Sequence, residues 1–162
     1  MNPTHVHLLI THLPIFGSIL GGFVLAYGLW TKSDQTKMAA YILLIVSAVG
    51  AGIGYLTGEA AEETVENIAG ISKDSVEQHE EFALIALVSL IVTGIASVVG
   101  LYLTSRKSPS ARVFAKFVLL ISLVSFGLAA RTGYLGGQIR HTEIKPNYIS
   151  PTQDGGNREH DE

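Results

Sequence analysis

Charged residues are absent from three long stretches of this chain and nearly absent from a fourth, and these stretches constrain its fold more than any other feature. Residues 1–31, 38–58 and 82–105 contain no Asp, Glu, Lys or Arg, and Arg131 is the one such residue between 117 and 139. Each stretch reaches the roughly 20 apolar residues needed to cross a bilayer core. None has the polar face that a helix at the surface of a soluble protein carries. The sequence therefore predicts four transmembrane helices, over residues 3–31, 37–60, 76–104 and 110–140.

The composition agrees with an all-α fold, an integral membrane antiparallel four-helix bundle. Charged residues make up 15% of the chain, whereas soluble domains average about 25%. The net charge is −3 and there is no Cys, which argues against nucleic-acid binding and excludes thiolate metal sites and iron–sulfur clusters. We expect residues 1–141 to form the bundle, with an acidic loop over 59–78, and the polar segment 142–162 to be a flexible tail.

The first apolar stretch can be interpreted as a cleaved signal peptide or as a helix of the mature protein. It has no positive n-region and is longer than a typical apolar signal region of about 7–15 residues. We therefore interpret it as a helix. Pro3 suits a first helical position, whereas Pro14 lies in the helix interior and should kink it, because the carbonyl of Ile10 loses its donor.

The loops between the four stretches differ sharply in charge. The connection 59–81 holds eight acidic residues and one basic residue. The positive-inside rule places the two basic loops in the cytoplasm, and therefore both termini on the extracytoplasmic side. The basic residues of those two loops are Lys32, Lys37, Arg106, Lys107, Arg112 and Lys116.

Five of the six histidines then fall on the extracytoplasmic side, namely His5, His7, His12, His79 and His141. His5 and His12 are two helical turns apart and share a face, from which His7 points away. In an up-down-up-down bundle the first and third helices lie diagonally across the core. We therefore expect His12 and His79 to face each other, and we interpret His7 as an interfacial residue.

Three functions are open for this pair. The first is ligation of a b-type haem by His12 and His79, with His5 or His141 as substitutes. Arg131 and Arg140 would then neutralise the haem propionates. The second is a Zn or Fe site. The third is a structural or interaction subunit whose histidines simply bond to backbone or headgroups. The candidate metal ligands are His12, His79, His141, Glu59 and Glu80.

Two further features leave alternatives open. Arg131 lies too deep in its helix to reach the interface, so it needs a partner, either Glu59 in a structural ion pair or a ligand carboxylate. Small residues also recur at helical spacing, which favours close helix packing or a flat cofactor lying against the backbone. These small residues are Gly17/Gly21, Ser18/Gly22, Gly50/Gly54/Gly58 and Gly133/Gly137.

Several short motifs resemble a family of small bacterial four-helix membrane proteins of unknown function. They are Thr11-His12-Leu13-Pro14-Ile15, Thr57-Gly58, and Gly133-Tyr134-Leu135-Gly136-Gly137 ahead of His141. The chain departs from the family pattern in having His5-Val6-His7 where His-Pro is usual and Leu13 where Phe is usual. Some members are cytochrome-b-like in bundle and histidine placement. The resemblance implies a bacterial inner-membrane protein with redox function and points to His12, His79 and His141.

We therefore expect a haem-b electron-transfer protein with its site near the extracytoplasmic face. From that position, a quinol or an extracytoplasmic cytochrome would be the redox partner, and the chain could be a homo-oligomer or a subunit of a larger complex. The sequence has no hydrolase triad, phosphate loop or nucleotide fingerprint that would indicate an enzyme in its own right. Transport is less favoured, because we identify no internal repeat.

Overall fold

The structure, a computed structural model, describes residues 3–66 and 73–140, and these residues are helical except at short turns. There are no strands among them. Four of the helices are long and apolar enough to cross a membrane, as expected. The helices are α1 (Pro3–Ile10), α2 (His12–Trp30), α3 (Asp34–Glu66), α4 (Lys73–Ser105) and α5 (Ala111–Arg140).

The first predicted helix is divided in two at Thr11. The backbone N–H of Thr11 still donates to the carbonyl of His7, at 3.0 Å. Pro14 has no N–H to offer the carbonyl of Ile10, so the helical bonding pattern is broken at this point. The predicted single helix 3–31 is therefore a short α1 followed by α2, and the interruption arises where the proline was expected to kink the chain.

The acidic connection is shorter than predicted. Helix α3 continues to Glu66 and α4 begins at Lys73, so the expected loop 59–78 is helical over 59–66 and 73–78. Ala and Glu, which dominate residues 59–66, are among the strongest helix formers and continue the helix beyond its apolar part. The predicted tail 142–162 lies outside the described residues.

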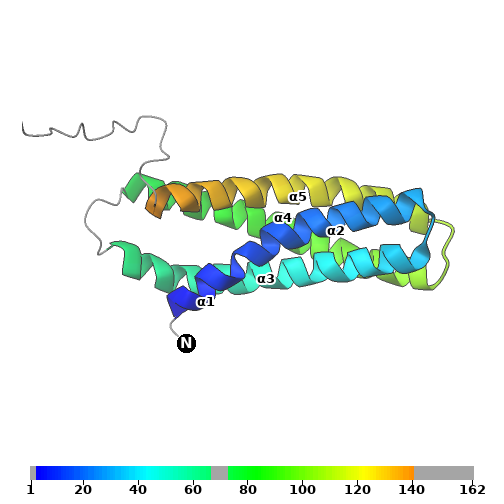
Figure 1. The fold of residues 1–162 in the computed structure, drawn as a ribbon, viewed down its shortest axis with the longest axis horizontal. Coiled ribbons are helices and arrows are strands. Elements are labelled where there is room, and N and C mark those ends of the chain that lie inside the picture. The colour runs from blue at the N-terminus through cyan, green and yellow to red at the C-terminus, as the bar shows by residue number, and fades with distance from the viewer. Residues whose placement is uncertain (1–2, 67–72, 141–162) are drawn as a thin grey trace, which may run out of the picture.

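The four long helices form a ring of neighbours. Helix α2 packs against α3 and α5, and α4 packs against the same two helices. Helices α2 and α4 therefore lie at opposite corners, as expected for the first and third predicted spans. The turns α2–α3 and α4–α5 lie at one end of the molecule, and the beginnings of α1 and α4 lie toward the other end, with the end of α5 (Figure 1).

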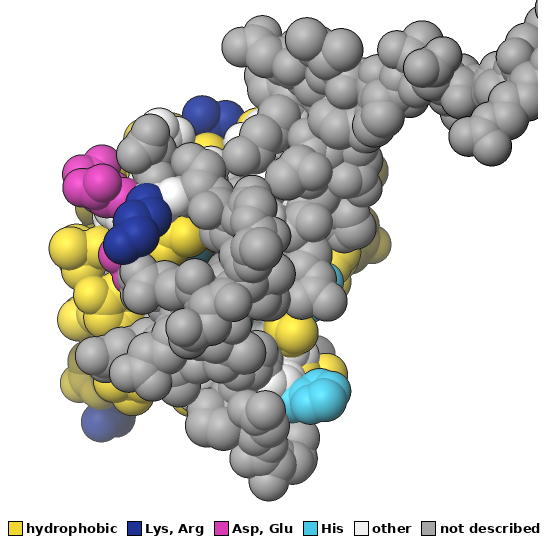
Figure 2. All heavy atoms as spheres, turned by 90° about the vertical axis from the view of Figure 1, so that its left-hand side faces the viewer, with side chains coloured by type: hydrophobic (Ala, Val, Ile, Leu, Met, Phe, Trp, Pro, Cys, Tyr) yellow, Lys and Arg dark blue, Asp and Glu magenta, His cyan; other side chains and the backbone are white. Residues whose placement is uncertain are grey.

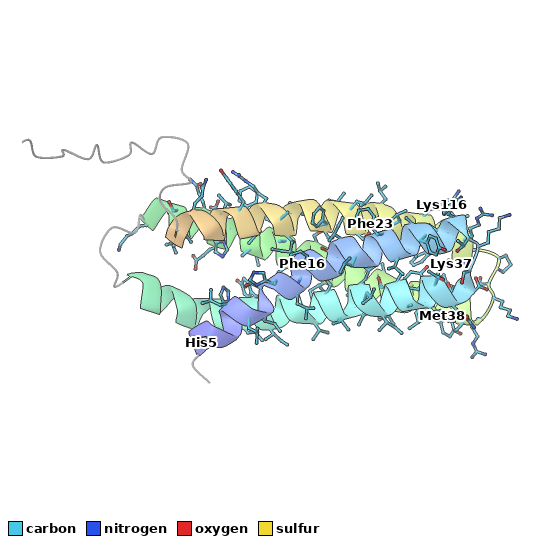
Figure 3. All side chains as sticks on the ribbon, viewed as in Figure 1. His5, Phe16, Phe23, Lys37, Met38 and Lys116 are labelled. Atoms are coloured by element: carbon cyan, nitrogen blue, oxygen red, sulfur yellow. The ribbon has the colours of Figure 1, made fainter. Side chains whose placement is uncertain are left out.

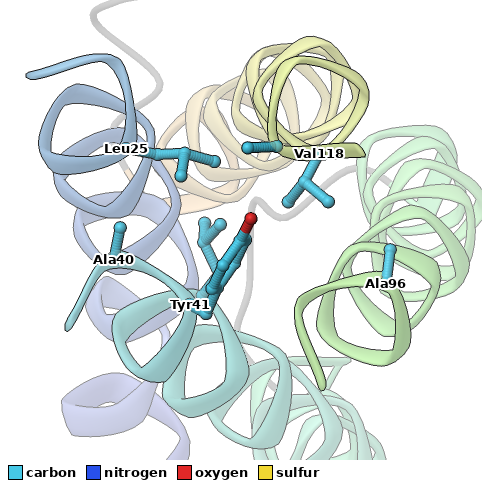
Figure 4. Close-up of a cluster of buried hydrophobic side chains, with 7 residues drawn as sticks. Leu25, Ala40, Tyr41, Ala96 and Val118 are labelled. Carbon is cyan, nitrogen blue, oxygen red and sulfur yellow. The ribbon is translucent and has the colours of Figure 1, made fainter. Parts of the chain in front are cut away.

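Close approach between the helices depends on their small residues. A Cβ added at Gly21 would lie 2.7 Å from the Leu44 side chain, and one at Gly94 would lie 2.6 Å from Ala48 Cβ. Neither space admits a larger residue without movement of the neighbouring side chain or helix. Close packing is thus a confirmed use of the glycines. One buried cluster fills the half of the bundle nearest the short turns and includes Leu25, Ala40, Tyr41, Ala96 and Val118 (Figure 4).

The outside of the bundle carries many large apolar side chains. Large aliphatic and aromatic side chains are exposed along all the long helices; Leu56 and Trp30, for example, are each 80% exposed. Hydroxyl groups, in contrast, are buried near the middle of the bundle. Ser125 Oγ lies 2.6 Å from Ser89 Oγ and 2.8 Å from Thr93 Oγ1. Interior hydroxyls joined by hydrogen bonds, with small residues beside them, are typical of packed helices in membranes.

Candidate functional site

Two histidines are seated between helices at the end of the molecule opposite the short turns. His79, near the start of α4, is partly buried, and its Nδ1 lies 3.0 Å from the carbonyl oxygen of Thr132 in α5. The ring packs closely on α5, because a Cβ added at Gly136 would lie 3.0 Å from His79 Cε1. The absence of a side chain at Gly136 is what allows the imidazole to reach the backbone of α5.

His7, in α1, makes the matching contact with α3. It is also partly buried, and its Nδ1 lies 2.8 Å from the carbonyl oxygen of Gly54. The Thr57 hydroxyl lies 3.4 Å from the same nitrogen. A Cβ added at Gly58 would lie 3.5 Å from His7 Cε1, so this ring also lies against a glycine of the neighbouring helix. At this end of the molecule α2 and α5 approach closely, because a Cβ added at Gly133 would lie 2.7 Å from Ile15 Cδ1.

These contacts determine which nitrogen of each ring is available. A carbonyl oxygen can only accept a hydrogen bond, so Nδ1 of both histidines must carry the hydrogen. In the neutral imidazole, Nε2 then keeps its lone pair free. Histidines that bind metals almost always donate their other N–H to a carbonyl or carboxylate, which fixes the tautomer and the orientation of the ring. His7 and His79 therefore have the hydrogen bonding of ligand histidines.

The expected pairing of His12 with His79 is not what the structure shows. The His12 side chain is exposed, its Nδ1 lies 3.2 Å from the carbonyl of Leu8 in the preceding turn, and its ring stacks on Phe16 at a centroid distance of 6.4 Å. Phe16 is itself 58% exposed. His12 therefore lies on the outside of the bundle, and His7 is the histidine of this region that reaches another helix.

The sequence did contain a signal for His7. The buried glycines Gly17 and Gly21 mark the side of α2 that packs against α3. A helix repeats about every 3.6 residues, so His7 precedes Gly21 by close to four whole turns, whereas His12 precedes it by two and a half. At this spacing His7 lies on the same side of the helix as Gly17 and Gly21, and His12 lies on the opposite side. His5 is exposed and lies near the start of α1 (Figure 3).

The guanidinium group of Arg131 lies near two aromatic rings. Its guanidinium carbon lies 5.6 Å from the ring centre of Phe82 in α4 and 5.4 Å from that of Tyr134 in α5. Cations are attracted to aromatic faces at such distances. The side chain is exposed and lies one residue before Thr132, the acceptor of His79. The predicted ion pair with Glu59 falls outside the described residues, because the Glu59 side chain is not among them.

The remaining predicted ligands divide into two groups. Glu80 is exposed on α4. Arg140 ends α5, but its side chain and the whole of His141 lie outside the described residues. Within the described part of the chain, no group of three or more His, Asp or Glu residues is arranged to hold a metal ion. The described residues thus provide two histidines, each hydrogen-bonded to a neighbouring helix, and no cluster of three or more possible metal ligands.

Viewed from the end of the molecule that carries this site, Lys or Arg and Asp or Glu side chains lie beside hydrophobic ones along one side, and a His side chain lies on the opposite side (Figure 2). Comparison with family models, with curated proteins and with solved structures finds no match to this chain. The function is therefore inferred from the geometry of His7 and His79.

Proposed function

We propose that the chain is an integral membrane protein, an antiparallel bundle of four spanning helices in a bacterial inner membrane. The exposed apolar exterior and the hydroxyl-containing interior support this proposal, because water favours the opposite distribution and lipid tolerates this one. The lysines and arginines at the short turns support a cytoplasmic location for that end. Lys37 and Lys116 lie there, far from His5 (Figure 3).

The natural lack of cysteine makes this topology directly testable. A single Cys at Ser33 or at Gln78 would be the one thiol of the chain. In intact cells, a membrane-impermeant maleimide should label Gln78→Cys and leave Ser33→Cys unlabelled until the membrane is opened. Labelling of Ser33→Cys alone would reverse the orientation. Equal labelling of both in intact cells would refute the membrane-spanning arrangement.

We further propose that the protein binds a b-type haem near its extracytoplasmic end and transfers electrons. The observation that carries this proposal is the shared hydrogen bonding of His7 and His79, which leaves Nε2 of both rings free to bind iron. When bound, haem supplies a one-electron redox couple whose potential the protein tunes through its axial ligands and surroundings. The partner would be a quinol in the membrane or an extracytoplasmic cytochrome.

The other residues near the site fit this role. The glycines beside both imidazoles let the rings lie against the neighbouring helices in fixed orientations. Arg131 is held between two aromatic rings within one residue of the acceptor of His79. Its guanidinium N–H groups can pair with a propionate. His79 is retained from the predicted pair, and His7 replaces His12 as its partner.

An absorption spectrum of the detergent-purified protein tests the haem proposal. Reduction with dithionite should produce the sharp α-band of a b-type haem. The band should be lost or strongly reduced in His7→Ala and His79→Ala. His12→Ala is the matched control, because His12 is exposed and bonds only to the Leu8 carbonyl one turn earlier, so this variant should keep the band.

Two results would overturn the haem proposal. One is a colourless protein purified from cells with ample haem, and the other is an α-band that survives in both His7→Ala and His79→Ala. Metal analysis of the same sample then separates the alternatives. A Zn or Fe ion at one per chain that disappears in His79→Ala would establish a divalent-metal site. A sample with neither haem nor metal would favour a structural or interaction subunit.

A further inference from the structure

The two tight turns of the molecule have the same construction. Lys32, after α2, and Lys107, after α4, both adopt positive φ, at 57° and 53°. In each turn the next residue closes the helix end: Ser33 N–H donates to the Gly28 carbonyl at 3.0 Å, and Ser108 N–H donates to the Leu103 carbonyl at 2.9 Å. Both are Schellman-type bonds. The number of residues that separates Lys32 from Lys107 also separates Ser33 from Ser108, and we call this separation the turn shift.

The turn shift also relates buried positions in the helices. A small or hydroxyl residue in the first pair of helices corresponds to a similar residue in the second pair, and all of them are buried. Sequence identity at this shift extends from the turns into the helices, for example at Tyr27 and Tyr102, both exposed. The buried pairs are Ser18/Thr93, Gly21/Ala96, Ala40/Ala115 and Ser47/Ser122.

A third correspondence lies beside the histidines. The motif Gly-Tyr-Leu-x-Gly occurs at residues 54–58 in α3 and at 133–137 in α5. The separation of these two copies exceeds the turn shift by about one helical turn. These correspondences indicate a weak internal repeat, which was not expected from the sequence. The repeat is weak along the sequence because its two copies move out of register by about a turn toward the histidine end.

The contacts of His7 and His79 are also arranged alike, one residue out of the register of this motif. In each pair of helices, a histidine near the beginning of the first helix donates from Nδ1 to a carbonyl of the second helix. In each case a glycine follows the acceptor residue about one turn later, Gly58 after Gly54 and Gly136 after Thr132. The two acceptors also lie at nearly the same depth in their helices, counted from the first residues of α3 and α5. His7 and His79 thus occupy equivalent places.

We propose that residues 3–66 and 73–140 are two equivalent helical hairpins, and that His7 and His79 are the equivalent ligands of one iron bound between them. This inference rests on the proposed haem function and extends it, because it assigns both axial positions of the iron to the protein. The ring of helix contacts is consistent with it: exchanging α2 with α4 and α3 with α5 leaves the set of neighbouring pairs unchanged.

Filling both axial positions has a chemical consequence. A six-coordinate iron has no open site for a small exogenous ligand such as carbon monoxide. The site would therefore transfer electrons without binding gases. Because the two histidines are equivalent, loss of either should open one position and have the same effect on the spectrum.

Carbon monoxide added to the dithionite-reduced holoprotein tests this inference. The spectrum of the unaltered protein should not change, whereas haem retained by His7→Ala or His79→Ala should bind the gas and shift its bands by similar amounts. Because either Ala variant can lose haem altogether, His7→Met and His79→Met are measured beside them. Methionine can still coordinate iron, and the two Met variants should give matching low-spin spectra.

The outcomes separate this inference from the proposal on which it rests. A colourless unaltered protein would overturn the haem function, and this inference with it. A haem-containing protein that binds carbon monoxide readily would overturn only the six-coordinate arrangement. Met variants with clearly different spectra, or a change caused by only one of the two positions, would refute the equivalence of the hairpins.

Discussion

Alanine at Gly136 and alanine at Gly58 should have different effects on stability, although both glycines lie beneath a histidine. The added methyl group at Gly136 would lie 3.0 Å from His79 Cε1 and 3.2 Å from its Nδ1, so the ring must move by a few tenths of an ångström. Such a movement strains the 3.0 Å bond to Thr132. At Gly58 the nearest atom of His7 is 3.5 Å away, an ordinary contact.

The expected magnitudes follow from two opposing effects. Replacing Gly by Ala inside a helix gains about 1 kcal/mol, and losing a neutral hydrogen bond costs about 0.5–1.5 kcal/mol. Gly58→Ala should therefore stabilise by about 1 kcal/mol, whereas in Gly136→Ala the two effects nearly cancel. For a chain of this size, about 1 kcal/mol corresponds to roughly 2–4 °C in Tm.

Thermal unfolding of the purified proteins in one detergent, followed by circular dichroism, measures this difference. We expect Gly58→Ala to unfold a few degrees above the unaltered protein and Gly136→Ala to unfold close to it. If Gly136→Ala were stabilised as much as Gly58→Ala, the imidazole of His79 would not be held against α5. A tautomer of His79 fixed by its contact with α5 would then be refuted.

Further substitutions test the packing and the turns by the same melting experiment. Gly28→Ala should destabilise the protein by about 1–3 kcal/mol, because its Cβ would lie 2.9 Å from a backbone nitrogen of α3. Gly127→Ala should stabilise it slightly, because a Cβ there has no atom within 4 Å. Equal effects of the two substitutions would contradict the packing. Ser125→Ala removes the hydroxyl shared by two neighbours and should cost about 0.6–1.7 kcal/mol; an unchanged Tm would show that this cluster contributes nothing. Lys32→Gly and Lys107→Gly should each stabilise by about 1 kcal/mol by relieving positive φ, and opposite signs would contradict the equivalence of the turns.

The number of long helices and the division of the first one could be predicted from the lengths of the apolar stretches and from Pro14. The four long apolar stretches predicted four long helices, and Pro14 predicted the interruption that divides α1 from α2. The ends of α3 and α4 were predicted less well, because hydropathy locates the apolar part of a helix and not its polar continuation. Residues 59–66 are rich in Glu and Ala, which lower the hydropathy of the segment but favour a helix, so α3 continues through them.

The site was predicted only in part. His79 could be selected from its position at the start of an apolar stretch, but the choice between His7 and His12 depends on how the N-terminal helices are rotated. The spacing of Gly17 and Gly21 carries that information, because glycines mark the packed side of α2. The contacts of His7 and His79 with neighbouring helices could not be predicted from the sequence. Each hydrogen bond joins a histidine to a carbonyl 47 or 53 residues away, and so depends on how the helices pack.

Titration of the apoprotein with haem, followed by absorbance, tests the central claim most directly. Our account predicts saturation at one haem per chain, with a low-spin spectrum, for the unaltered protein and for the His12→Ala control. The double variant His7→Ala/His79→Ala should show no saturable binding. Saturable low-spin binding in that double variant, or its loss in His12→Ala alone, would contradict the assignment of His7 and His79 as the ligands.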